Sequence, residues 1–229
     1  MQINTTAPNN ATALTWVEAS PYNSLNVTAS WTKSTSGDLG NQKIQFYADG
    51  TCTTASGSLI DLASASTQTK AFTAPSAGTY SYKITSINTA LNSSVSNCSG
   101  AMVIDLTAPT AATPLSWTQT SPYNSLSVTA SWTKSVSTDL ANQKIQFYAD
   151  STCTTASGSL IDLASASTQT KAFTAPSAGT YSYKITSIDT ATNSTVSGCS
   201  SAMVIDLTAP NAATALTWVE TSPSGSLSV

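Results

Sequence analysis

Four cysteines are the residues of this chain whose type and spacing best support covalent chemistry. They occur as Cys52 and Cys98 and again as Cys153 and Cys199, in a sequence without histidine. An even number of cysteines at a repeated spacing predicts disulfides, and therefore an oxidising compartment. Zinc sites need closely spaced ligands and redox catalysis usually uses a CxxC pair, and the sequence offers neither.

Other catalytic groups are scarce. Ser–His–Asp and Cys–His sites are impossible without histidine. The aspartates are isolated in the sequence at predicted turns and strand ends, where this residue normally forms turns. With eight lysines, no arginine and a net charge of −3, the chain lacks the clustered cations that nucleic-acid binding requires. We therefore expect neither an enzyme nor a nucleic-acid-binding protein.

The chain repeats itself, as shown by Trp16, Trp117 and Trp218, which lie 101 residues apart. Repetition of this length indicates an array of domains rather than one large enzyme fold. We predict two complete domains at 7–107 and 108–208, which differ at only 17 positions. Residues 1–6 are predicted to be the last strand of a preceding repeat, and 209–229 part of a third.

Because both ends fall inside predicted repeats, we expect the chain to be a segment of a longer array with its targeting signal upstream. No signal-peptide pattern follows Met1. No run of about 18 apolar residues predicts a membrane span.

Apolar residues alternate with polar ones along each repeat, which predicts strands and no helix of useful length. In the second repeat the predicted strands are 115–118, 126–132, 145–149, 160–163, 169–174, 181–185 and 202–207. In the last of these, Ala202, Val204 and Leu207 mark the strand, with Met203 and Ile205 on its other face. About seven short strands separated by turns in about 100 residues predict an all-β antiparallel sandwich.

Three stretches carry a family resemblance: SVTASWTKS at 127–135, TYSYKITSIDTATNST at 180–195 and VIDLTAP at 204–210. They are similar to fibronectin type III and bacterial immunoglobulin-like repeats, which place a tryptophan on strand B and a Tyr-x-Tyr pattern on strand F. The resemblance covers both full repeats and implies tandem sandwich domains joined by short proline-containing linkers. The paired cysteines depart from fibronectin type III modules, which usually lack disulfides.

The linker that joins the first repeat to the second contains Asp105 and Pro109, and the linker at the end of the second contains Asp206 and Pro210. Proline fixes φ and restricts the residue before it, so a short joint without glycine favours a stiff rod. Arrays that this chain resembles stiffen their joints with Ca²⁺, which implies Asp105, Asp189 and Asp206 as candidate ligands. Calcium needs six to eight oxygen ligands. The low density of acids instead favours turn hydrogen bonding, with no metal and no other cofactor.

Two disulfide pairings remain open. Pairing Cys52 with Cys98 and Cys153 with Cys199 gives each repeat its own crosslink, and this is the pairing we expect. The alternative starts from the predicted strands: Cys52 follows one strand, and Cys98 begins the last strand of its repeat. In an immunoglobulin-like sandwich these two points tend towards opposite ends of the domain. Cys52 would then lie near Cys199, at the start of the last strand of the next repeat.

Four aromatic residues near the start of each repeat are candidate ligand-binding groups: Trp16, Tyr22, Trp117 and Tyr123. An exposed tryptophan stacks well on a sugar ring. The interpretation we favour is that the two tryptophans cover the edge of the sandwich core.

These features predict a structural or adhesive module in the stalk or fibre of a bacterial extracellular or cell-surface protein. Its expected partners are other copies of the same repeat or chain, which in a fibre would pack against 209–229. The alternative is a carbohydrate- or receptor-binding module that recognises a host or cell-surface glycan or protein.

Overall fold

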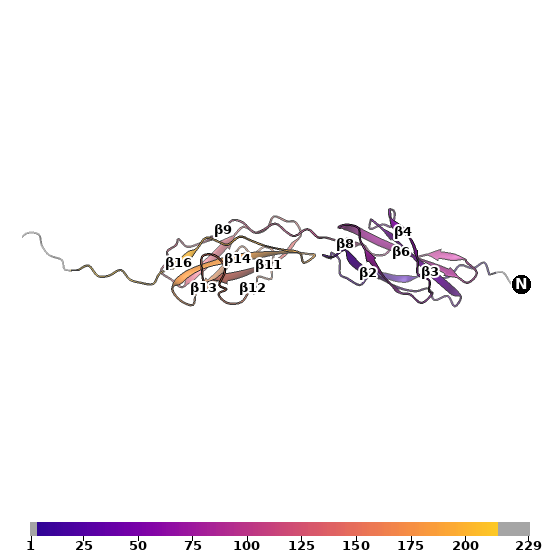
Figure 1. Cartoon of the computed structure of the whole chain (residues 1–229), viewed down its shortest axis with the longest axis horizontal. Helices are drawn as coiled ribbons and strands as arrows, with labels where there is room; N and C mark the ends of the chain where they lie inside the picture. Colours follow the sequence, from indigo (N-terminus) through magenta and orange to yellow (C-terminus); the bar gives the residue numbers. More distant parts are fainter. Residues whose placement is uncertain (1–3, 215–229) are drawn as a thin grey trace, which may run out of the picture.

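The computed structural model describes residues 4–214, in which all regular structure is β-strand (Figure 1). Strands β1–β8 and β9–β16 form two sandwiches that follow one another end to end, and no sheet contains strands from both. Residues 1–3 and 215–229 lie outside the described residues. They include the start of the predicted preceding strand, most of the predicted third repeat and its expected contact with another chain.

The strands of the first sandwich are β1 (Thr12–Trp16), β2 (Asn26–Thr32), β3 (Leu39–Tyr47), β4 (Ala55–Asp61), β5 (Thr69–Thr73), β6 (Gly78–Asn88), β7 (Ser93–Val95) and β8 (Met102–Ile104). Those of the second are β9 (Leu115–Trp117), β10 (Ser127–Trp132), β11 (Leu140–Tyr148), β12 (Ile161–Asp162), β13 (Thr170–Thr174), β14 (Gly179–Asp189), β15 (Ser194–Val196) and β16 (Met203–Ile205).

Each sandwich has a three-stranded layer and a larger layer, and all pairings between their strands are antiparallel. In the first sandwich the layers are β1-β2-β5 and β4-β3-β6-β7, with β8 also paired to β6. The second repeats this order with β9-β10-β13 and β12-β11-β14-β15, and β16 pairs with β14. The predicted all-β sandwich of the immunoglobulin and fibronectin type III kind is confirmed by this strand order.

Aromatic side chains fill the space between the layers. Phe46 of β3 stacks on Phe72 of β5, with ring centroids 4.2 Å apart. Tyr82 of β6 is fully buried and donates its hydroxyl to the backbone carbonyls of Thr15 and Ser30 on the opposite layer. This hydrogen bonding satisfies the one polar atom of a ring that the alternation of β6 directs inward.

The last strand of each sandwich directs its bulkier residues into the core. Met203 and Ile205 are buried, whereas Val204 between them is 39% exposed. Met102 and Ile104 of β8 are buried in the same way. The core face is therefore the one that carries the methionine and isoleucine.

Disulfides join Cys52 to Cys98 and Cys153 to Cys199, which is the pairing within each repeat. Cys98 does not begin the last strand but lies between β7 and β8, both of which pair with β6. Because the last strand is divided there, Cys98 reaches the loop after β3, and the two Cα atoms are 5.8 Å apart. The layout behind the alternative pairing, with Cys52 and Cys98 at opposite ends of the sandwich, was therefore wrong.

Within residues 4–214 there is no helix of the length and apolar character needed to cross a membrane.

Candidate functional site

Polar side chains of both sandwiches meet where the linker after β8 contacts the loop between β14 and β15. Asn193 Nδ2 in this loop donates to the backbone carbonyl of Asp105 at 2.9 Å. Across the same boundary, Asn23 Nδ2 donates to Thr192 Oγ1 at 3.2 Å. The backbone N and Nδ2 of Asn193 also donate to the Asp189 carboxylate, at 2.8 and 2.9 Å. The loop that holds the linker thus depends on Asp189 for its shape; we call this contact region the middle joint.

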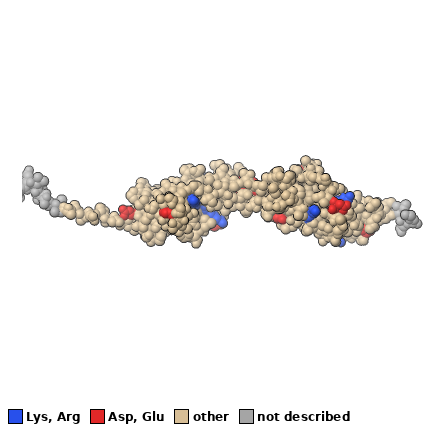
Figure 2. Space-filling model, viewed as in Figure 1, with Lys and Arg blue, Asp and Glu red and all other residues tan. Residues whose placement is uncertain are grey.

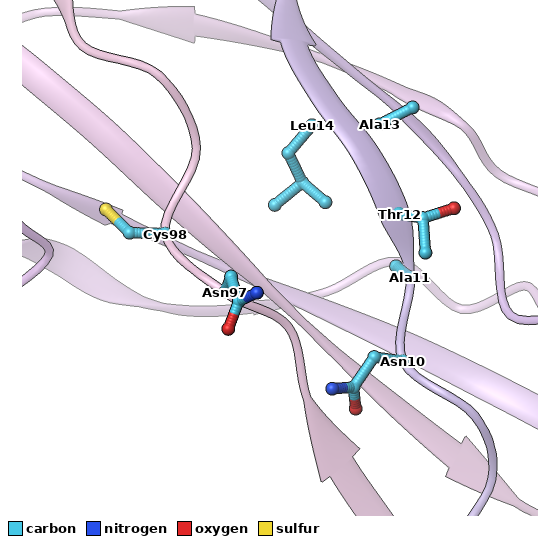
Figure 3. Close-up of a pocket in the computed structure, with 7 residues that line it drawn as sticks. All are labelled: Asn10, Ala11, Thr12, Ala13, Leu14, Asn97 and Cys98. Atoms are coloured by element: carbon cyan, nitrogen blue, oxygen red, sulfur yellow. The ribbon is translucent and has the colours of Figure 1, made fainter.

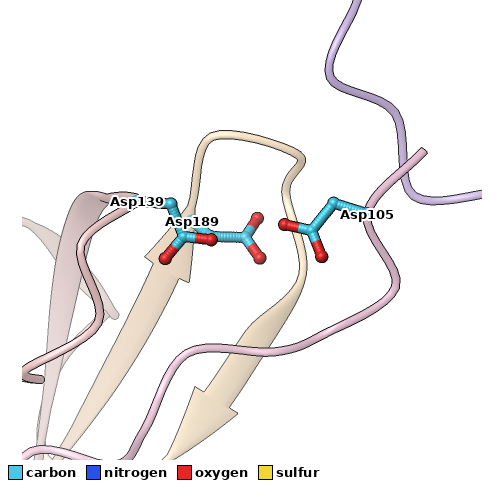
Figure 4. A group of neighbouring side chains, drawn as sticks. All are labelled: Asp105, Asp139 and Asp189. Atoms are coloured by element: carbon cyan, nitrogen blue, oxygen red, sulfur yellow. The ribbon is translucent and has the colours of Figure 1, made fainter. Parts of the chain in front are cut away.

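Three carboxylates converge at the middle joint (Figure 4). Asp105 belongs to the linker, Asp139 to the loop before β11 and Asp189 to the end of β14. One oxygen of each lies within 4.8 Å of the others. Asp189 is only 2% exposed, and the two ion pairs found among residues 4–214 involve other carboxylates. The three carboxylates therefore lie close together without a lysine partner among residues 4–214. The face of the molecule drawn in Figure 2 carries few charged side chains.

The first sandwich has the same arrangement with different chemistry. The residues that match the three carboxylates are Asn4, Asp38 and Asn88. Asn4 Nδ2 and Asn88 Nδ2 both donate to Asp38 Oδ2, at 2.9 and 3.0 Å. Two neutral amides thus stabilise a single carboxylate here. At the middle joint both donors are replaced by carboxylates, and the stabilising hydrogen bonds are lost.

The donor set of the middle joint fits a hard cation. Carboxylate oxygens are the ligands that Ca²⁺ prefers, and it completes its shell of six to eight oxygens with backbone carbonyls and water. Asp105, Asp139 and Asp189 are the residues that would hold it. A bound cation would supply the positive charge that the two asparagine amides supply only partially in the first sandwich.

The structure brings two of the three expected calcium ligands together and not the third. Asp105 and Asp189 lie in the cluster, whereas Asp206 lies in the linker beyond β16, where its Oδ1 accepts from Thr208 N at 2.8 Å. Asp139 was missed because its turn reads as an ordinary surface turn. A comparison of the two repeats contained a signal for it: Asp139 matches Asp38, and Asp189 stands where the first repeat has Asn88.

The prolines of the linkers have different surroundings. Pro109 is buried at the start of the second sandwich, as Pro8 is at the start of the first. Pro210 is exposed. Burial of Pro109 fixes the backbone where the linker enters the second sandwich, which restricts the middle joint.

The four candidate aromatic residues have partners inside the fold. Trp16 meets Tyr82 edge to face with centroids 5.1 Å apart, and its Nε1 donates to a backbone carbonyl at 3.0 Å. Trp117 makes the corresponding contacts in the second sandwich. Tyr22 and Tyr123 bridge to the last strand of their own sandwich through the backbone. Sugar stacking on these rings stays a prediction.

A second polar arrangement supports each disulfide. Partial burial opposes ionisation of Asp49, but its carboxylate accepts from Thr53 Oγ1 and from the backbone N of Thr54. These hydrogen bonds hold the pKa of Asp49 well below its usual range. Asp150 has the same surroundings in the second sandwich. The loop that carries Cys52 is thereby fixed, which is a structural role.

No protein-family profile and no curated protein sequence matches the chain. Solved structures of other proteins are similar to it, and two of them are tandem-domain structures. The FN1–FN3 domains of chicken CNTN1 have 14% identity and a TM-score of 0.49, covering 87% of this chain and 68% of that one. The fibronectin(III)-like modules of CbhA from Clostridium thermocellum have 13% identity and a TM-score of 0.42, covering 83% of this chain and 94% of that one.

Proposed function

We propose that this chain is a structural part of an extracellular stalk or fibre, in which sandwiches are held end to end by ordered joints. The observation that carries the proposal is one contact made twice. Asn193 Nδ2 donates to the carbonyl of Asp105, and Asn92 Nδ2 donates to the carbonyl of Asn4, both at 2.9 Å. We expect the same contact at the successive linkers of a longer array, where it would fix the sandwiches in the same way.

The crosslinks support an oxidising, extracellular setting. Each sandwich has one disulfide, and the described residues contain no free cysteine. Disulfides persist in secreted and surface proteins and are rare in the cytosol. The fold and its few charges suit a spacer that projects another part of the protein away from a cell.

Small-angle X-ray scattering on the intact chain tests the rod. We expect the maximum dimension of two sandwiches in line and a narrow distribution of inter-domain distances. Asn193→Ala removes the linker contact and should broaden that distribution. The control is Val17→Thr, which places the matching residue of the second repeat at a position 64% exposed. Identical profiles for the parent and Asn193→Ala would contradict the fixed joint.

A second candidate function concerns calcium at the middle joint. It is supported by the three carboxylates within 4.8 Å of one another. Calcium there would screen their repulsion and hold the linker against the second sandwich, so the stiffness of the stalk would depend on the external Ca²⁺ concentration. Calorimetry of the double variant Asp105→Asn/Asp189→Asn, in a chelator and in excess calcium, tests this proposal.

A further inference from the structure

A pocket opens on the first sandwich between β1 and the segment before β8. Its volume is about 320 Å³, at the lower end of the range of about 300–1,000 Å³ that is common for small-molecule sites. Seven residues line it (Figure 3): Asn10, Ala11, Thr12, Ala13, Leu14, Asn97 and Cys98.

An irregularity of β1 forms one wall of this pocket. The pairing register of β1 with β2 shifts between Thr12 and Thr15, and Ala13 inside the shift has a φ of 50°. This left-handed conformation is costly for a residue with a Cβ. Bulges and strained residues of this kind are enriched beside binding sites, where they turn the backbone away from regular pairing.

The lining is polar and uncharged. Asn10 and Asn97 are exposed, and neither side-chain amide is hydrogen-bonded to another residue in 4–214. Figure 3 shows Asn10 on the segment that leads into β1 and Asn97 on the segment that carries Cys98. Each amide offers donors and an acceptor, and Leu14 adds an apolar surface beside them. No ionisable side chain lines the pocket, so nothing there balances a charged ligand.

The second sandwich does not share this lining. Ala111, Pro114 and Gly198 stand where the first sandwich has Asn10, Ala13 and Asn97. Three of the seven lining positions thus differ, although the two repeats differ at only 17 positions in all. Because the differences are concentrated at this pocket, its surface is specific to the first sandwich, whereas most of the remaining sequence is shared by both.

We infer that this pocket binds a neutral saccharide residue. Each sugar hydroxyl both donates and accepts, which matches the two amides, and the C–H face of a pyranose ring suits Leu14. An apolar ligand would leave both amides desolvated without partners. No aromatic ring lines the pocket, so the expected affinity is in the millimolar range. This inference does not depend on the stalk function, since a spacer can carry a glycan site on one of its repeats.

A nuclear magnetic resonance titration of the intact chain tests the inference. The probes are neutral sugars (glucose, galactose, N-acetylglucosamine and their disaccharides) at about 10 mM, tenfold above a Kd of ~1 mM. We expect at least one of them to shift the backbone amides of 10–14 and 97–98 and leave 111–113 and 198–199 unchanged. The double variant Asn10→Ala/Asn97→Gly, which introduces the residues of the second repeat, should weaken binding about tenfold through two lost hydrogen bonds.

Leu91→Thr is the matched control, because it also introduces a residue of the second repeat at a position 83% exposed and outside the pocket. It should bind sugar as the parent does. The inference is overturned if no probe shifts these amides, if both sandwiches respond equally, or if the double variant keeps the parent affinity. Stronger binding of a sulfated sugar would overturn the neutral class.

Discussion

The double variant Asp105→Asn/Asp189→Asn gives the middle joint the chemistry of Asn4 and Asn88. One oxygen of each carboxylate lies within 4.8 Å of the others. At that distance two unit charges repel by about 0.9 kcal/mol in water and by about 3.5 kcal/mol at an effective dielectric constant of 20. The variant removes all three repulsions and offers Asp139 two amide donors, as Asp38 has.

We expect the variant to be more stable than the parent in a chelator. Asp105 and Asp139 are partly exposed, so solvent screens the repulsion. We therefore expect the free energy of unfolding to rise by about 1–2 kcal/mol. For a domain of about 100 residues this raises the Tm of the second sandwich by roughly 5–10 °C. Calcium should make the parent the more stable of the two, because calcium at 100 times its Kd adds about 2.7 kcal/mol to the free energy of unfolding of the parent alone.

Differential scanning calorimetry in a chelator and in excess calcium measures both effects. Glu18→Gln is the charge control: it removes one acid, and Gln119 shows that glutamine keeps the contact, accepting from Thr129 N at 2.8 Å. Its Tm should not respond to calcium differently from that of the parent. The reasoning fails if parent and double variant melt together in the chelator, or if calcium stabilises both equally.

Three further outcomes are expected. Replacing Cys153 and Cys199 by alanine frees a loop with a sequence separation of 46, which should lower the free energy of unfolding by about 4 kcal/mol in urea titrations; an unchanged midpoint would contradict this. Burial raises the pKa of Tyr183 to about 12, so its contribution to stability is complete below pH 10 and is lost as the pH rises towards 12; absorbance at 295 nm should lose one late step in Tyr183→Phe. Asp150, whose pKa is held below its usual range, stabilises the fold above about pH 4, and this contribution is lost at more acidic pH; Asp150→Asn should therefore melt earlier at pH 7 and lose part of the acid sensitivity, and equal melting at pH 7 would contradict the role of this carboxylate.

Alternation made the central strands predictable. Ile145 and Phe147 of β11 and Tyr183 of β14 face inward as their spacing predicted, because one face of each strand packs on the opposite layer. The last strand carried no such signal, since its residues are apolar on both faces. Its division around Cys98 depends on the pairing of β7 and β8 with different parts of β6, which is a tertiary feature.

The middle joint was predictable in part. Asp105 and Asp189 were expected as calcium ligands through the family resemblance, although they are 84 residues apart in the sequence. Asp139 belongs to the second sandwich and meets Asp105 only when the linker docks on the loop between β14 and β15. A contact that depends on how one domain follows another leaves no local pattern in the sequence of either domain.

Comparison of the two repeats shows how small a change alters a joint. Asn and Asp have nearly the same shape, so the loop hydrogen bonds survive the exchange: Asn88 Oδ1 accepts from the backbone N of Asn92, and Asp189 Oδ1 accepts from that of Asn193. The exchange removes the amide donors directed at the central carboxylate and the hydrogen bond from Asn88 Nδ2 to the backbone carbonyl of Thr6, and charge takes their place. Alternation between Asn and Asp at these positions would therefore vary the cation dependence of a joint without altering the sandwiches on either side.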